Sequence, residues 1–156
     1  MDYLQELSTV IPIAIVAAGS LVAILTDAFS EKAKKTYWIA VVTLAFAFAA
    51  SVVDIFAAPE FAFGGLIAYG GVAAFGQALV LFGTLFCVLI SHEYLRDIEH
   101  EFGEVYSLVL FAAVGMLALA MSNDLIMIFL GIETMSICLY VLAGVIKDKK
   151  TGAESA

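Results

Sequence analysis

The chain has 156 residues, of which 63% are apolar and only 14% are charged, and its mean hydropathy is +1.06. A soluble domain is nearer to about half apolar and a quarter charged, so these values exclude an ordinary water-soluble domain. They also exclude a disordered chain, which needs low hydrophobicity and high charge. An integral membrane protein is the class that remains.

Five apolar stretches approach the roughly 20 residues with which a helix crosses a bilayer. They run over residues 7–25, 37–53, 75–90, 106–121 and 125–146. Each is expected to be helical, because hydrocarbon offers no water to the backbone and a helix satisfies its own polar groups. The sequence therefore predicts an all-α integral membrane protein with about five transmembrane helices.

Two of the connections have features of their own. Residues 61–74 are apolar but interrupted by glycines, which argues against a spanning helix and favours a non-cytoplasmic loop lying against the membrane or the protein. The interrupting residues are Gly64, Gly65, Gly70 and Gly71. Only residues 122–124 separate the last two stretches, so we expect a tight antiparallel helical hairpin in which Asp124 caps the second helix.

The seven basic residues predict the orientation, because Lys and Arg are retained on the cytoplasmic side of a membrane. All of them fall on alternate connections, namely Lys32, Lys34, Lys35, Arg96, Lys147, Lys149 and Lys150. The amino terminus is therefore predicted to lie outside the cytoplasm. The first segment carries Asp2 and Glu6 in place of the positive start of a cleavable signal peptide, so we expect it to be retained.

Most of the net charge of −8 is dispersed along the chain, and its one concentration is residues 92–104, which include two histidines and several carboxylates. A helical zinc motif needs histidines at positions i and i+4 with Glu at i+1. His92 and Glu93 are present, but the fifth position is Arg96. We therefore expect no metal site but a solvated cytoplasmic loop that contacts a neighbouring subunit. Cys87 and Cys138 lie inside spans, where cysteine behaves as a small apolar residue.

Glu133 is the candidate functional residue. It lies near the middle of the fifth predicted span, where a carboxylate costs at least about 2.5–3.5 kcal/mol and is rarely found without a partner or a water-filled cavity. Ser136, Tyr140 and Phe129 share its helix face, which forms a narrow polar stripe suited to a bundle interior. A proton-relay carboxylate and a protonated structural glutamate are the two interpretations, and a relay needs a cation that this chain does not supply at membrane depth.

Four sequence motifs lie in and next to the last two predicted spans, namely Glu104 to Leu110, Ala120 to Leu125, Phe129-Leu130-Gly131-Ile132-Glu133 and Leu139 to Gly144. They resemble the amino-terminal part of the NADH-quinone oxidoreductase subunit N family, whose members are antiporter-like, proton-pumping membrane subunits of respiratory complex I. Residues 151–156 resemble the lead-in to the family's sixth helix. By this resemblance the chain would stop where that helix begins.

The resemblance implies a fourteen-helix fold with two inverted five-helix repeats, of which this chain would be about the first third. Residues 1–104 would hold three peripheral helices, residues 105–146 the first two helices of the first repeat, and residues 147–156 a cytoplasmic lead-in. Glu133 would be the fifth-helix glutamate that pairs with a lysine beyond Ala156. Glu104 matches a family carboxylate at the cytoplasmic mouth of the fourth helix and would have a secondary role.

The implied function is proton translocation through a half-channel containing Glu133, coupled to quinone reduction elsewhere in an enzyme complex, in a bacterial inner membrane. No cofactor is expected in this chain, which has neither a cysteine cluster nor a phosphate loop. NADH, flavin, iron–sulfur clusters and quinone would bind other subunits. The expected partners are other membrane-arm subunits, lipid and protons, not nucleic acid. The isolated chain is not expected to pump.

Two alternatives remain open at this point. One is an antiporter-like subunit of a cation/proton antiporter or of a membrane-bound hydrogenase, which shares the motif around Glu133. The other is a non-transporting membrane scaffold subunit in which Glu133 makes only a packing contact.

Overall fold

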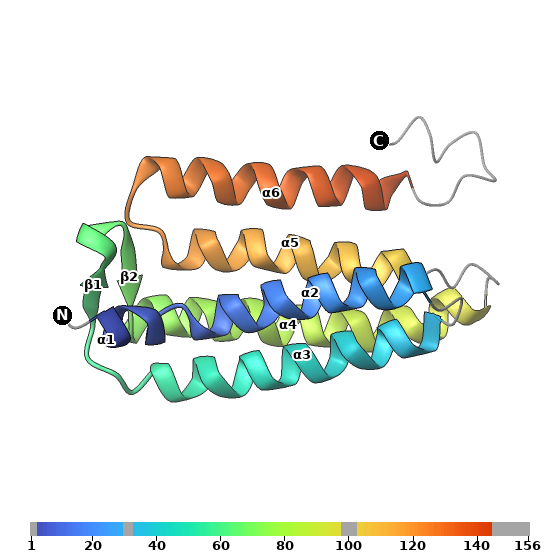
Figure 1. The fold of residues 1–156 in the computed structure, drawn as a ribbon, viewed down its shortest axis with the longest axis horizontal. Coiled ribbons are helices and arrows are strands. Elements are labelled where there is room, and N and C mark those ends of the chain that lie inside the picture. The colour runs from blue at the N-terminus through green and yellow to red at the C-terminus, as the bar shows by residue number, and fades with distance from the viewer. Residues whose placement is uncertain (1–2, 30–32, 98–102, 145–156) are drawn as a thin grey trace.

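The computed structural model describes residues 3–29, 33–97 and 103–144 (Figure 1). The described helices are α1 (Tyr3–Ser8), α2 (Ile11–Phe29), α3 (Ala33–Asp54), α4 (Gly71–Asp97), α5 (Gly103–Met121) and α6 (Leu125–Ala143). A small hairpin of β1 (Glu60–Ala62) and β2 (Ile67–Tyr69) encloses the short 3-10 helix η1 (Phe63–Gly65). Helices α2 to α6 are each long and apolar enough to cross a membrane. The predicted all-α membrane fold with five spanning helices is confirmed.

The bounds of α4 differ from the predicted span over residues 75–90. The helix begins at Gly71 and ends at Asp97, so that it includes the polar residues from Ser91 onward. The expectation of a loop over residues 92–104 is therefore wrong for residues 92–97 and for Gly103 and Glu104, which begin α5, whereas residues 98–102 lie outside the described residues. Helical backbone bonding continues past the apolar run because a helix end that projects beyond hydrocarbon is as well bonded in water as in lipid.

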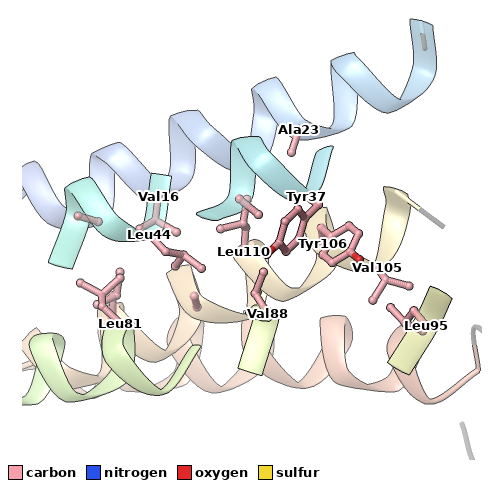
Figure 2. Packing of buried hydrophobic residues seen from close by; sticks show 14 residues of the cluster. Val16, Ala23, Tyr37, Leu44, Leu81, Val88, Leu95, Val105, Tyr106 and Leu110 are labelled. Carbon is pink, nitrogen blue, oxygen red and sulfur yellow. The ribbon is translucent and has the colours of Figure 1, made fainter. Parts of the chain in front are cut away.

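Four of the helices form a bundle, and the fifth spanning helix lies beside it (Figure 1). Helices α2, α3, α4 and α5 pack against one another, whereas α6 packs mainly along α5. Fully buried side chains fill the bundle, and the largest belong to Tyr106, Leu44, Leu81, Leu110 and Leu117. Figure 2 shows Leu44, Leu81 and Leu110 from three different helices pointing into this shared core.

The glycine-interrupted segment forms the β-hairpin. Glu60 pairs with Tyr69 and Ala62 with Ile67 in an antiparallel register. The four glycines predicted to interrupt a helix all have positive φ, a conformation that side chains disfavour. At Gly70 a Cβ atom would also lie 2.6 Å from the carbonyl oxygen of Ala58, so both the φ and the close approach require glycine there.

The hairpin is attached to the turn between α5 and α6. The amide nitrogen of Asn123 donates to the carbonyl oxygen of Leu66 at 3.0 Å, and its side-chain Nδ2 donates to that of Gly65 at 2.8 Å. Asp124 caps α6 as predicted, because its Oδ1 accepts from the amide of Ile126 at 2.8 Å. The short antiparallel connection between these helices is confirmed.

The two ends of the bundle differ in charge. The end with the β-hairpin, here the hairpin end, has no Lys or Arg in its described residues. The opposite end, here the basic end, carries the exposed Lys34 and Lys35 at the start of α3. Arg96 belongs to the last turn of α4, and Lys32, Lys147, Lys149 and Lys150 lie outside the described residues, as does the predicted lead-in 147–156.

Candidate functional site

Glu133 lies at mid-height of α6. It is eight residues from the start of the helix at Leu125 and ten from its end at Ala143, which at 1.5 Å per residue is about 12 and 15 Å. Both distances are about half of the roughly 30 Å hydrocarbon thickness of a bilayer. When α6 spans a membrane, the carboxylate is therefore close to the midplane.

The contact between α5 and α6 sets which way Glu133 points. Gly131 packs against the backbone of Gly115 and the side chain of Leu119, and Cys138 on the same side of α6 is buried. Glu133 follows Gly131 by two positions, which rotates it by about 200° around the helix. It therefore points away from α5 and is exposed.

The predicted polar stripe consequently does not face the interior of the described bundle. Phe129 and Tyr140 are also exposed, at 64% and 61%, and only Ser136 is half-buried. The prediction of an inward-facing stripe is wrong for the five helices of this chain. The physical reason is that Gly131 has no side chain and therefore lets α6 approach α5 closely, so that the Gly131 side of α6 faces α5.

Glu104 lies in the first turn of α5 at the basic end and is exposed. Because Gly115 is opposite Gly131, residue 113 of this antiparallel pair lies at about the level of Glu133. Glu104 is nine residues further along α5, or about 14 Å away along the axis. The structure therefore does not bring the two predicted site carboxylates together.

His92 packs into the protein and is not part of a solvated loop. Its ring stacks on that of Tyr37 with centroids 3.9 Å apart, and its Nδ1 lies 3.1 Å from the hydroxyl oxygen of the fully buried Tyr106. Figure 2 shows Tyr37 and Tyr106 side by side at the basic end of the core. In the part of the chain that the structure describes, no three His, Cys, Asp or Glu side chains gather as metal ligands.

A second polar contact, at the hairpin end, was not expected from the sequence. The hydroxyl of Tyr69 donates to Oδ1 of Asp54 at 2.9 Å, joining β2 to the end of α3. Burial raises the pKa of the Tyr69 phenol above its usual value of 10.0. This hydrogen bond and the negative charges of Asp54 and Glu60 raise that pKa further. The sequence suggested this contact only in that Asp54 lies shortly before the glycine-rich segment that contains Tyr69.

Known proteins resemble the chain over nearly its whole length. It is 34% identical over 151 residues to the NADH-quinone oxidoreductase subunit N of Salinibacter ruber. The match covers 97% of this chain and 30% of the relative. It is also 31% identical over 153 residues to the NADH-quinone oxidoreductase subunit N 1 of Chloroherpeton thalassium. That match covers 98% of this chain and 32% of the relative. No protein-family model matches the chain.

A solved structure gives the same result. A chain of respiratory complex I from Thermus thermophilus with bound aureothin superposes with a TM-score of 0.75 at 30% identity, over 92% of this chain and 31% of that chain. This chain is a homologue of part of NADH-quinone oxidoreductase subunit N. The resemblance on which the sequence interpretation rests is confirmed.

The relatives belong to NADH-quinone oxidoreductase, which is an enzyme complex. The homology and the five long apolar helices together identify the chain as a multi-pass membrane protein. The chain spans about a third of the length of these relatives.

Proposed function

We propose that the chain contributes to proton translocation in the membrane arm of an NADH-quinone oxidoreductase, with Glu133 as a proton-relay carboxylate. The observation that carries this proposal is the position of Glu133, at mid-height of α6 and turned away from α5, the helix along which α6 mainly packs in the described part of the chain. A carboxylate at that depth needs a cation, a hydrogen-bonding partner or a water-filled cavity. Each would have to come from protein or water on the outward side of α6.

The chemistry follows from the environment of the carboxyl group. A nearby cation favours the ionised form, and hydrocarbon surroundings favour the protonated form. A partner lysine that approaches and withdraws would therefore make Glu133 release and take up a proton. The resemblance to subunit N implies that this lysine would come from another helix, and not from the 156 residues of this chain. Glu104 would have a secondary role at the basic end.

The chain itself supplies no redox chemistry in this proposal. NADH, flavin, iron–sulfur clusters and quinone would be held by other subunits, and the energy would arrive as a change in electrostatics along the membrane arm. The partners of the chain would be neighbouring membrane-arm subunits and lipid. The basic end would face the cytoplasm of a bacterial cell, with the amino terminus and the β-hairpin outside.

The test is Glu133→Gln in the assembled complex, reconstituted in liposomes. Glutamine keeps the size and polarity of the side chain but carries no exchangeable acidic proton, so the number of protons pumped per NADH oxidised is expected to fall while the complex still assembles. Glu93→Gln is the matched control, because Glu93 is an exposed carboxylate at the end of α4. Unchanged pumping and assembly in Glu133→Gln would instead support a scaffold role.

A further inference from the structure

Helix α3 carries a groove on its exposed side, and α3 and α6 lie on opposite sides of the bundle (Figure 1). The groove has a volume of about 300 Å³ and is lined by Trp38, Ile39, Val42 and Thr43. It adjoins the contact between α3 and α2, because a Cβ atom at Gly19 of α2 would collide with the Thr43 side chain. Apart from the Thr43 hydroxyl and the Trp38 indole N–H, these side chains offer only carbon to an occupant.

Two lysines lie at the basic end of this groove. Lys34 and Lys35 belong to the first turn of α3 and are exposed. Lys35 precedes Trp38 by three positions and Val42 by seven, and these spacings place all three side chains on one side of a helix. The groove therefore has a positively charged end, which is followed along the same side of α3 by a surface of carbon.

The two parts of the groove lie at the depths of the two parts of a phospholipid. The apolar part of α3 runs from Lys34 to Asp54 and has 21 residues. At 1.5 Å per residue it is about as long as the roughly 30 Å hydrocarbon thickness of a bilayer. The lysines are then at the membrane surface, where phosphates lie, and Val42 is about 12 Å deeper. Trp38 lies between them, at the interface that tryptophan prefers.

The ring of Trp38 is held by neighbouring rings. It meets the ring of the buried Tyr37 edge to face, with centroids 5.4 Å apart, and Tyr37 in turn stacks on His92 of α4 at 3.9 Å. The indole N–H forms no hydrogen bond with the described part of the chain. It can therefore donate to an acceptor between the lysines and the carbon surface, which is the level of the ester carbonyls of a phospholipid.

Three described carboxylates at the basic end, those of Asp27, Glu93 and Glu104, do not line the groove. Asp27 of α2 is directed at the start of α5, because a Cβ atom at Gly103 would collide with its carboxylate. Glu93 of α4 lines a separate hollow together with Tyr37, and Glu104 follows Gly103 on α5. The described charge at the mouth of the groove is therefore positive, which favours an anionic occupant.

We propose that this groove binds one anionic phospholipid of the surrounding bilayer. The phosphate lies at Lys34 and Lys35, and a glycerol ester carbonyl accepts from the indole N–H of Trp38. One acyl chain runs along Ile39 and Val42. An apolar helix of a partner protein would cover the carbon surface but would leave both lysines without a counter-charge. The site does not depend on the proposed proton relay, because it requires only that α3 spans the membrane.

The experiment is photolabelling of the assembled complex in phosphatidylcholine liposomes. A small fraction of the lipid is phosphatidylglycerol with a diazirine in one acyl chain, and the labelled peptides are identified by mass spectrometry. Residues 33–43 are expected to be labelled, and the same diazirine on phosphatidylcholine to label them less, by roughly fivefold for each lysine that binds the phosphate. The double variant Lys34→Gln/Lys35→Gln should remove this preference, whereas Lys34→Arg/Lys35→Arg, which keeps both charges, should retain it.

A second variant tests the carbon surface. Val42→Trp fills the groove and is expected to lower the labelling of residues 33–43 by either lipid. Leu79→Trp is the matched control, because Leu79 is also an exposed apolar residue but belongs to α4. Labelling of residues 33–43 should not change in that variant.

Equal labelling by the two lipids, or a preference that survives Lys34→Gln/Lys35→Gln, would overturn recognition of the phosphate. Absence of label from residues 33–43 with both lipids would show that protein covers this side of α3, and would overturn the site. Should the double variant fail to assemble, the comparison of the two lipids in the unaltered complex and the effect of Val42→Trp still decide. No proton pumping is measured, so failure of this site and failure of the proposed function are distinguishable.

Discussion

Gly115 of α5 and Gly131 of α6 face each other across a close helix contact in which backbone approaches backbone. A Cβ atom on residue 115 would lie 2.8 Å from the carbonyl oxygen of Gly131 and 2.7 Å from the amide nitrogen of Met135. Small residues permit such an approach, and packing of this kind holds helices together in lipid. The orientation of Glu133 depends on it.

Replacing Gly115 by alanine is expected to force α5 and α6 apart, because the new methyl group meets rigid backbone. The expected destabilisation is about 1–3 kcal/mol, as for other overpacked interiors, and is measured as a lower midpoint of thermal unfolding in detergent. Gly83→Ala is the matched control, because nothing lies within 4 Å of its would-be Cβ. At that position alanine should stabilise the helix by roughly 0.5–1 kcal/mol. Equal effects at both positions would contradict this account.

Removing the Asn123 side-chain amide should loosen the β-hairpin. Asn123→Ala loses the hydrogen bond to the Gly65 carbonyl at 2.8 Å but keeps the backbone bond to Leu66. A net cost of about 1 kcal/mol is expected, together with faster amide hydrogen exchange over residues 60–69. Ser122→Ala is the comparison, because the Ser122 hydroxyl bonds only to its own helix at Leu119. Exchange over the hairpin should not change in that variant.

The Asp54–Tyr69 contact predicts a decline of stability at alkaline pH. The folded-state pKa of Tyr69 is raised, so the unfolded chain loses the phenolic proton first. The stabilisation is fully present below about pH 10 and is lost as the pH rises through the folded-state value. Tyr69→Phe should remove this contribution to the alkaline decline and cost about 1 kcal/mol at neutral pH through the lost hydrogen bond. Unfolding midpoints of both proteins from pH 7 upward provide the measurement.

The proposed orientation predicts opposite labelling at the two ends. In a background without Cys87 and Cys138, a cysteine at the exposed Glu60 should react with a membrane-impermeant maleimide added to intact cells. A cysteine at the exposed Lys35 should react only after the membrane is opened. The reverse pattern would show that the basic end faces outward.

The sequence predicted the number of spanning helices, the interrupted segment and the Asp124 cap, because each depends on local composition. Span length follows from the apolar run, and Gly64, Gly65, Gly70 and Gly71 mark backbone with positive φ. That this segment attaches to the turn between α5 and α6 was not predictable, because its partner Asn123 is more than 50 residues away in the sequence.

The rotation of each helix was also beyond the sequence. The spans are apolar on nearly every side, so hydrophobic periodicity does not distinguish a buried from a lipid-facing side. The outward position of Glu133 follows instead from the pairing of Gly131 with Gly115. Likewise, the stacking of His92 on Tyr37 joins residues from α4 and α3, and only their common position near the ends of two spans could have suggested it.

The short connection between α5 and α6 constrains how the protein enters the membrane during biogenesis. Residues 122–124 reach at most about 10 Å when fully extended, far less than the roughly 30 Å thickness of the hydrocarbon. With α5 across the bilayer, the start of α6 therefore cannot lie at the opposite membrane face, and α6 can only lie beside α5 or at the face where α5 ends. Glu133 thus enters the bilayer directly next to α5, against which α6 packs.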